Sequence, residues 1–293
     1  MSFKARLLKL AYWTIPGGIY NGILKLRENR VKENEVRNDP LFELIQSNEI
    51  FRNAHKGKRC FILCNGPSIN TQNLHLLEDE IVFSVSNGYR HPDYLAFQPA
   101  FHCVPSIVYS EKFTESIAVD WFREMDKGIG SATLFLSTNE YDLVQRYQLF
   151  QGRKVHYVYL GSPWENGRSS VYDICNKIPG VMSVSILCLM LSLYCGFDNV
   201  YLLGTEHDVL TKKKYNYFYD TSETIFSNKI ENHSDQGELS FPLSVSLNIL
   251  SELWKEYESL NTIAKRNNIH IFNATNGGDL DVFPRADLDF MFV

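Results

Sequence analysis

Short apolar runs separated by longer mixed segments recur along most of the chain. The first run is CFILC at residues 60–64, and IVFSVS follows at residues 81–86. A short continuous apolar run is typical of a strand that helices cover on both faces. The pattern therefore predicts an α/β fold with a mostly parallel sheet. Further candidate strands lie at residues 100–105, 132–137, 155–160, 200–203 and 269–272.

Two long segments in the C-terminal half of the chain have the pattern of helices. Residues 182–195 are apolar almost throughout, which indicates a buried helix, and the strand VYLL follows after a short turn and stops at Gly204. From Ser244 to Arg266 apolar residues recur at helical spacing. Because successive parallel strands end at one edge of a sheet, VYLL should open onto the same crevice as CFILC. We therefore predict a Rossmann-like fold.

The polar segments divide the chain. Residues 33–58 are charged and locally helical, so we predict an N-terminal amphipathic or helical extension over residues 1–57 and a Rossmann-like domain over residues 58–293. Within that domain, residues 209–242 are polar, aromatic and irregular, which predicts a lid over the site.

The first 32 residues combine aromatic and basic side chains with a single acid, Glu28. Such a segment can lie on an anionic membrane surface, or pack as an amphipathic helix on the domain or on a partner subunit of a homo-oligomer. No run of eighteen apolar residues is present, so a transmembrane helix is not expected. We expect a cytoplasmic protein, peripheral at the inner face of the cytoplasmic membrane.

The charge and the cysteines narrow the class of partner. A net charge of −5 provides no basic field for a polyanion, so nucleic acid is not expected as a partner. The spacing of the six cysteines matches neither zinc ligands nor a small disulfide framework, which agrees with a reducing cytoplasm.

The residues that follow the first two strands are candidates for ligand binding. In Asn65-Gly66-Pro67-Ser68 the glycine allows close approach of a ligand, the proline fixes the turn, and Ser68 caps a helix whose N–H groups attract anions. The motif is neither GxGxxG nor the phosphate loop of kinases, so hydride transfer and ordinary kinase chemistry lose support. Asn87, after the second strand, could contact a sugar or base. Each motif could instead be a simple turn.

Three further motifs lie later in the chain. Thr205, Glu206, His207 and Asp208 follow the VYLL strand and could bind a metal, position a donor, or only make structural hydrogen bonds. Tyr215, Tyr217 and Tyr219 could stabilise a departing phosphate, or pack beneath a solvated loop. His233, in a polar loop, is a candidate general base, although a loop histidine is more often a surface residue.

In their order these motifs resemble those of the bacterial sialyltransferases of glycosyltransferase family 42. The resemblance rests on NGPS after the first strand, Asn87 after the second, the helix start Met182-Ser183-Val184-Ser185, the strand VYLLG, the tyrosine-rich loop and the following histidine. Sialyltransferase-like and 6-hydroxymethylpterin diphosphokinase-like (MptE-like) proteins share much of this plan. The resemblance covers residues 58–285.

The resemblance implies an inverting glycosyltransferase that uses CMP-sialic acid and requires no metal or other cofactor. Residue by residue, it implies that Asn65, Gly66, Ser68 and Asn87 contact CMP and that Ser183 and Ser185 offer it a helix start. Tyr215, Tyr217 or Tyr219 would hold the leaving phosphate, and His233 would deprotonate the acceptor. The chain departs from the family in its longer tyrosine loop and in Gly-Thr-Glu-His-Asp, where the family has Gly-Ile-Asp.

We therefore expect transfer of a sugar, from a CMP-linked nonulosonic acid, to a cell-surface glycan or lipid-linked acceptor. Two alternatives remain open. One is a diphosphotransferase of the hydroxymethylpterin type, in which Glu206 and Asp208 bind Mg²⁺. The other is a nucleotide-binding module without catalysis.

Overall fold

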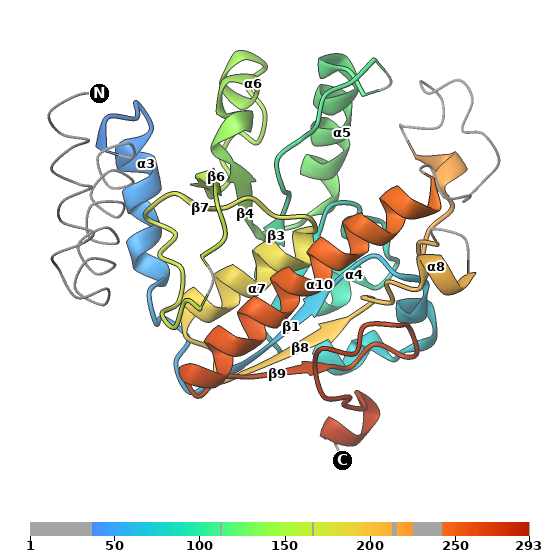
Figure 1. Cartoon of the computed structure of the whole chain (residues 1–293). Helices are drawn as coiled ribbons and strands as arrows, with labels where there is room; N and C mark the ends of the chain where they lie inside the picture. Colours follow the sequence, from blue (N-terminus) through green and yellow to red (C-terminus); the bar gives the residue numbers. More distant parts are fainter. Residues whose placement is uncertain (1–36, 112, 166, 213–215, 225–241, 293) are drawn as a thin grey trace, which may run out of the picture.

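A seven-stranded sheet forms the centre of the protein. The computed structural model describes residues 37–111, 113–165, 167–212, 216–224 and 242–292 (Figure 1). All strand pairs are parallel, in the order β5-β4-β3-β2-β1-β8-β9, which confirms the predicted α/β class. The strands are β1 (Arg59–Leu63), β2 (Val82–Val85), β3 (Phe101–Cys103), β4 (Thr133–Ser137), β5 (Val155–Val158), β8 (Asn199–Leu203) and β9 (His270–Asn273).

Helices cover both faces of this sheet. In β1 the side chains of Cys60 and Ile62 join the core beneath α7 and α10, whereas Phe61 and Leu63 join the core beneath α5. This alternation explains why residues 60–63 of the strand are all apolar. The α-helices are α3 (Phe42–Gln46), α4 (Tyr94–Phe97), α5 (Glu115–Gly128), α6 (Tyr141–Arg146), α7 (Val184–Cys195), α8 (Val209–Lys212) and α10 (Leu243–Arg266).

The helix α7 is the most deeply buried of these elements. Eleven of its twelve residues are buried, because α7 lies between the sheet and α10, which crosses in front of it (Figure 1). It ends at Gly196, which adopts the left-handed conformation at the C-cap. The predicted strand at residues 155–160 is wrong in its extent. β5 ends at Val158, and β6 (Leu160–Ser162) pairs instead with β7 (Ile178–Pro179) in a separate two-stranded sheet.

Short 3₁₀ helices make most of the remaining connections. They are η1 (Ser47–Phe51), η2 (Pro67–Thr71), η3 (Leu74–Leu77), η4 (Gly88–Arg90), η5 (Thr138–Glu140), η6 (Thr221–Glu223) and η7 (Asp289–Phe292). The segment formed by α3 and η1 packs against the sheet, since Ile45 is fully buried and the Asn48 amide donates to Tyr157 O at 2.8 Å. Among the described residues, no helix is long and apolar enough to cross a membrane.

The strand order locates the crevice expected to bind a ligand. From β1 the chain builds β2 to β5 on one side, and β8 and β9 on the other. In such sheets ligands bind at the carboxyl edge, next to the point where the order reverses. Here that point lies between β1 and β8, so the residues following these strands and β2 define the region to examine.

Candidate functional site

Two backbone amides of the turn after β1 are already bonded within the protein. Gly66 N donates to Gly204 O at 3.0 Å, and Ser68 N donates to Glu206 Oε1 at 2.7 Å. The prediction that Ser68 caps a helix is wrong, because Gly66 is the N-cap of η2 and Ser68 Oγ has no hydrogen-bond partner. The helix is also a single 3₁₀ turn, Pro67–Thr71, with Pro67 at its first position.

The glycine in this turn makes room for the Glu206 carboxylate. A Cβ on Gly66 would lie 1.6 Å from Glu206 Oε2 and 2.6 Å from Gly204 O. Gly278 lies against the backbone of the same residue, where a Cβ would lie 2.5 Å from Glu206 Cα. A phosphate about 4 Å from this carboxylate would be repelled by about 4 kcal/mol at an effective dielectric constant near 20. This repulsion exceeds the net stabilisation from one amide hydrogen bond, so a phosphate binds at this turn only if Glu206 moves away.

The other residues after β8 have separate partners. Thr205 N donates to Thr275 Oγ1 at 3.0 Å, and the Asp208 carboxylate pairs with Lys212 Nζ at 2.6 Å. His207 points instead toward α10. Within the described part of the chain, Glu206, His207 and Asp208 do not form a set of converging metal ligands.

A hydrogen-bonded chain links the end of β8 to the start of α7. His207 Nε2 lies 2.7 Å from the Tyr257 hydroxyl, which lies 2.5 Å from Ser185 Oγ. Ser185 Oγ lies 2.7 Å from Ser183 Oγ, and Ser183 caps α7 by accepting from Ser185 N. Burial lowers the pKa of His207 to about 4, although the neighbouring Asp208 acts in the opposite direction. Near neutral pH the imidazole is therefore uncharged.

The residue beside Tyr257 holds the same helix start. Glu256 Oε2 accepts from Met182 N at 3.0 Å, and Glu256 Oε1 accepts from Trp164 Nε1 at 3.0 Å. Burial raises the pKa of this carboxyl from 4.5 to about 7, against the effect of these two donors. Glu256 and Tyr257 lie far along the chain from α7 and belong to no motif, so the sequence did not reveal their role.

The tyrosine loop docks against the ends of β1 and β2. Phe218 N donates to Asn65 O at 3.0 Å, and Asn70 Nδ2 donates to Phe218 O at 2.7 Å. The Tyr219 hydroxyl accepts from Asn87 Nδ2 at 2.9 Å, and its ring stacks on Tyr217 with centroids 5.3 Å apart.

The structure thus brings together four residues predicted from separate motifs, namely Asn65, Asn87, Tyr217 and Tyr219. Burial raises the pKa of Tyr219, so this phenol keeps its proton, while Tyr217 is exposed. Tyr215 and His233 lie outside the described residues.

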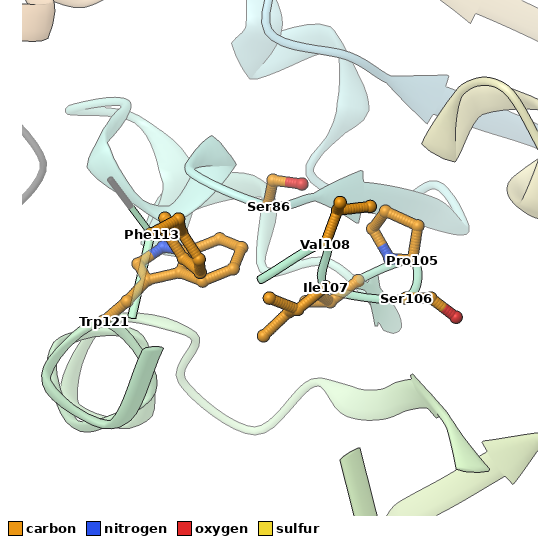
Figure 2. A pocket seen from close by; sticks show the side chains of 8 residues that line it. Ser86, Pro105, Ser106, Ile107, Val108, Phe113 and Trp121 are labelled. Carbon is orange, nitrogen blue, oxygen red and sulfur yellow. The ribbon is translucent and has the colours of Figure 1, made fainter. Parts of the chain in front are cut away.

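An open pocket of about 210 Å³ lies beside Trp121 (Figure 2). Trp121 Nε1 donates to Asn87 Oδ1 at 2.7 Å, so the Asn87 amide joins the pocket wall to Tyr219. Ser86 lies at the pocket with a positive φ of 45°, an uncommon conformation for a residue other than glycine. The apolar lining explains why no sequence motif marked the pocket. It consists of Val104, Pro105, Ile107, Val108, Phe113 and Trp121.

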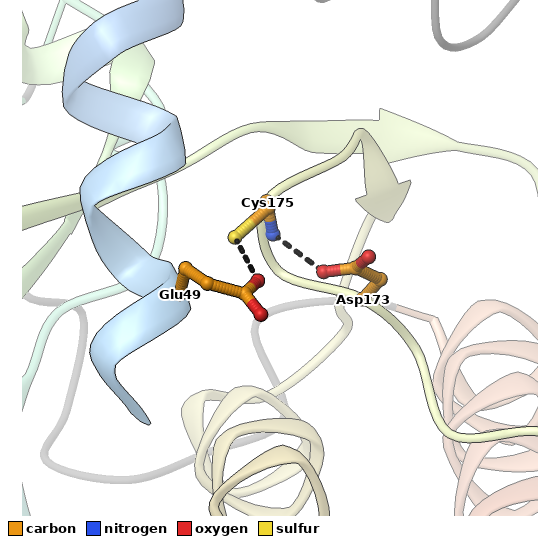
Figure 3. A group of neighbouring side chains, drawn as sticks. All are labelled: Glu49, Asp173 and Cys175. Carbon is orange, nitrogen blue, oxygen red and sulfur yellow. Dashed lines mark hydrogen bonds between the residues drawn. The ribbon is translucent and has the colours of Figure 1, made fainter. Parts of the chain in front are cut away.

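A second cluster, formed by Glu49, Asp173 and Cys175, lies between η1 and the loop that precedes β7 (Figure 3). Its potential ligand atoms lie within 4.8 Å of one another. However, Arg52 bonds Glu49 at 2.6 Å and Asp173 at 2.9 Å, and this guanidinium lowers the pKa of Glu49 to about 2. Because a cation already neutralises the carboxylates, the cluster is an ion-pair group that ties η1 to this loop.

Comparison with known proteins gives limited guidance. No model of a protein family matches the sequence, and no curated protein matches it. Among solved structures, the chain is similar to the MAf glycosyltransferase from Magnetospirillum magneticum AMB-1, with 15% identity and a TM-score of 0.45. The similarity covers 85% of this chain and 39% of that protein, so the chain spans about two fifths of its length. At this level the similarity does not establish an activity.

Proposed function

We propose that the chain is a glycosyltransferase that moves a sugar from a nucleotide donor to a glycan acceptor at the carboxyl edge of the sheet. The observation that carries the proposal is the docking of the tyrosine loop at the ends of β1 and β2. Phe218 N donates to Asn65 O, Asn87 Nδ2 donates to the Tyr219 hydroxyl, and Tyr217 stacks on Tyr219. Phenol groups that keep their protons can donate to the oxygen of a departing phosphate.

The phosphate of the donor binds on the tyrosine side of this site. The Glu206 carboxylate accepts the Ser68 amide in the β1 turn and repels an anion there. In the reaction the acceptor oxygen bonds to the anomeric carbon while the bond from that carbon to the phosphate oxygen breaks. The phosphate leaves with the bonding electron pair, and the acceptor proton passes to a base. We assign this role to His233, and the donor to a CMP-linked nonulosonic acid.

The alternative of a metal-dependent diphosphotransferase has less support. That activity would need the carboxylates of Glu206 and Asp208 to converge on one cation. Instead, Glu206 accepts from Ser68 N, and Asp208 pairs with Lys212. We also infer a lipid-linked or cell-surface acceptor and a location at the inner face of the membrane, from the basic and aromatic residues 1–32, which lie outside the described residues.

The proposal is tested first by thermal-shift measurements with CMP, CDP, UDP, GDP and ATP. We expect CMP to raise the melting temperature most, and no shift with any nucleotide would refute nucleotide binding. Release of CMP from CMP-sialic acid, measured in EDTA, then tests transfer. Full activity in EDTA supports sugar transfer, whereas binding without turnover of any donor would support the non-catalytic module.

Two single substitutions test the role of the tyrosines. Tyr217→Phe and Tyr219→Phe should each lower kcat by about 10²-fold, because each removes one donor to the leaving phosphate. Tyr147→Phe is a matched control, since Tyr147 is a partly exposed phenol at the end of α6. Unchanged kcat in both test variants would overturn the assignment.

A further inference from the structure

We propose that the pocket beside Asn87 binds the base ring of the donor nucleotide, and that Asn87 positions the pocket relative to the tyrosines. The inference rests on the proposed function and names which part of the donor lies where. The lining of the pocket includes none of the residues that the sequence motifs assigned to the phosphate.

The shape and chemistry of the pocket fit a planar ring. Its volume of about 210 Å³ exceeds the roughly 150 Å³ of an engineered cavity that binds benzene in another protein, so one six-membered heterocycle fits. Trp121 and Phe113 line it, with ring centroids 6.3 Å apart and nearly perpendicular planes. Such aromatic walls favour a flat π-system over a flexible chain.

The walls of the pocket are held in place before any ligand binds. Trp121 Nε1 donates to Asn87 Oδ1, which fixes the plane of the indole. On the opposite side, Ile107 N donates to Glu140 Oε1 at 2.8 Å and the Tyr109 hydroxyl donates to Glu140 Oε2 at 3.0 Å. Glu140 is fully buried, so this loop is anchored from beneath. Preorganisation of this kind reduces the entropy lost when a ligand binds.

Asn87 connects the pocket wall to the tyrosine site. The same Asn87 amide that bonds Trp121 also donates to the Tyr219 hydroxyl at 2.9 Å. A nucleotide whose base lies against Trp121 can therefore extend across Asn87 and place its phosphate near Tyr217. The left-handed backbone of Ser86 supports this assignment, because strained conformations of this type concentrate at binding sites.

Binding of cytidine, which carries no phosphate, tests the pocket separately from catalysis. Saturation-transfer NMR with cytidine should detect binding to the wild-type protein. Ile107→Trp fills the pocket and should weaken binding of cytidine and CMP at least tenfold. Leu95→Trp is the matched control, since Leu95 is exposed on α4 outside the pocket, and it should bind cytidine normally.

The outcomes separate this inference from the proposed function. Equal binding of cytidine or CMP by wild type and Ile107→Trp would overturn the inference, as would competition by alkyl compounds but not by nucleosides. The wild-type protein could bind cytidine, lose this binding in Ile107→Trp, and yet transfer no sugar. That result would support the pocket as the binding site of the base and refute only the proposed transferase activity. Circular dichroism of Ile107→Trp would verify its fold, and Val104→Phe offers a smaller filling of the same pocket.

Discussion

The buried carboxyl of Glu256 should make the protein less stable as the pH rises. Its pKa is about 7 in the folded state against 4.5 for an unperturbed glutamate. Because one pKa unit corresponds to about 1.4 kcal/mol, this difference amounts to about 3 kcal/mol. The folded state binds this proton more tightly than the unfolded state does. The loss of stability caused by ionising Glu256 is therefore absent below pH 4.5, grows as the pH rises, and is complete above pH 7.

Glu256→Gln removes the titration and keeps the shape of the protonated side chain. The free energies of unfolding of the variant and the wild type are compared by urea denaturation from pH 4.5 to pH 8. We expect the difference, variant minus wild type, to increase by up to about 3 kcal/mol across this range. The gain should follow the titration, with its midpoint between the two pKa values.

Glu252→Gln serves as the control, one turn earlier on α10, where the carboxylate is exposed and pairs with Lys255. The same urea series on this variant shows the effect of removing an exposed carboxylate from the same helix. The argument is that burial raises the pKa of Glu256 more than the two hydrogen bonds from Met182 and Trp164 lower it. It would be refuted if the stability difference between Glu256→Gln and the wild type did not change with pH, or if the variant became less stable relative to the wild type above pH 7.

Three other substitutions test local packing and charge. Gly278→Ala should destabilise the protein by about 1–3 kcal/mol more than Gly277→Ala in urea unfolding, because both glycines have positive φ but only Gly278 abuts Glu206; equal losses would contradict this contact. His207→Asn should flatten the loss of stability between pH 6.5 and pH 4, since burial lowers the folded pKa of His207 and its protonation favours unfolding in that range; an unchanged acid limb would contradict it. Asn87→Ala should cost about 1–3 kcal/mol and alter tryptophan fluorescence, because the buried indole N–H loses its acceptor; an unchanged spectrum and stability would show that this bond is dispensable.

The sheet could be predicted because its strands are buried on both faces and therefore read as continuous apolar runs. The prediction at residues 155–160 failed because Leu160 continues the apolar run of β5 although the chain leaves the main sheet, and Gly161 then adopts a φ of 120°. Local composition does not reveal which of two sheets a residue joins.

The sequence predicted that the candidate residues follow the ends of the strands, but not which groups they contact there. The motifs pointed to the carboxyl edge, since strand ends can be read from local sequence. The acceptor of the Ser68 amide is Glu206, which lies 138 positions later in the chain. Whether an amide is free depends on such a tertiary contact, which a single sequence does not contain. The same holds for the contact of Tyr257 with Ser185.

The two hydrogen bonds of Asn87 have a thermodynamic consequence. Trp121 and Tyr219 share one amide group, so the rotamer of Asn87 that suits one ring is the rotamer offered to the other. A change of the Asn87 rotamer that moves the indole would therefore also move the phenol. Linkage would make this coupling mutual, so a perturbation at either ring would change the free energy of the other by the same amount.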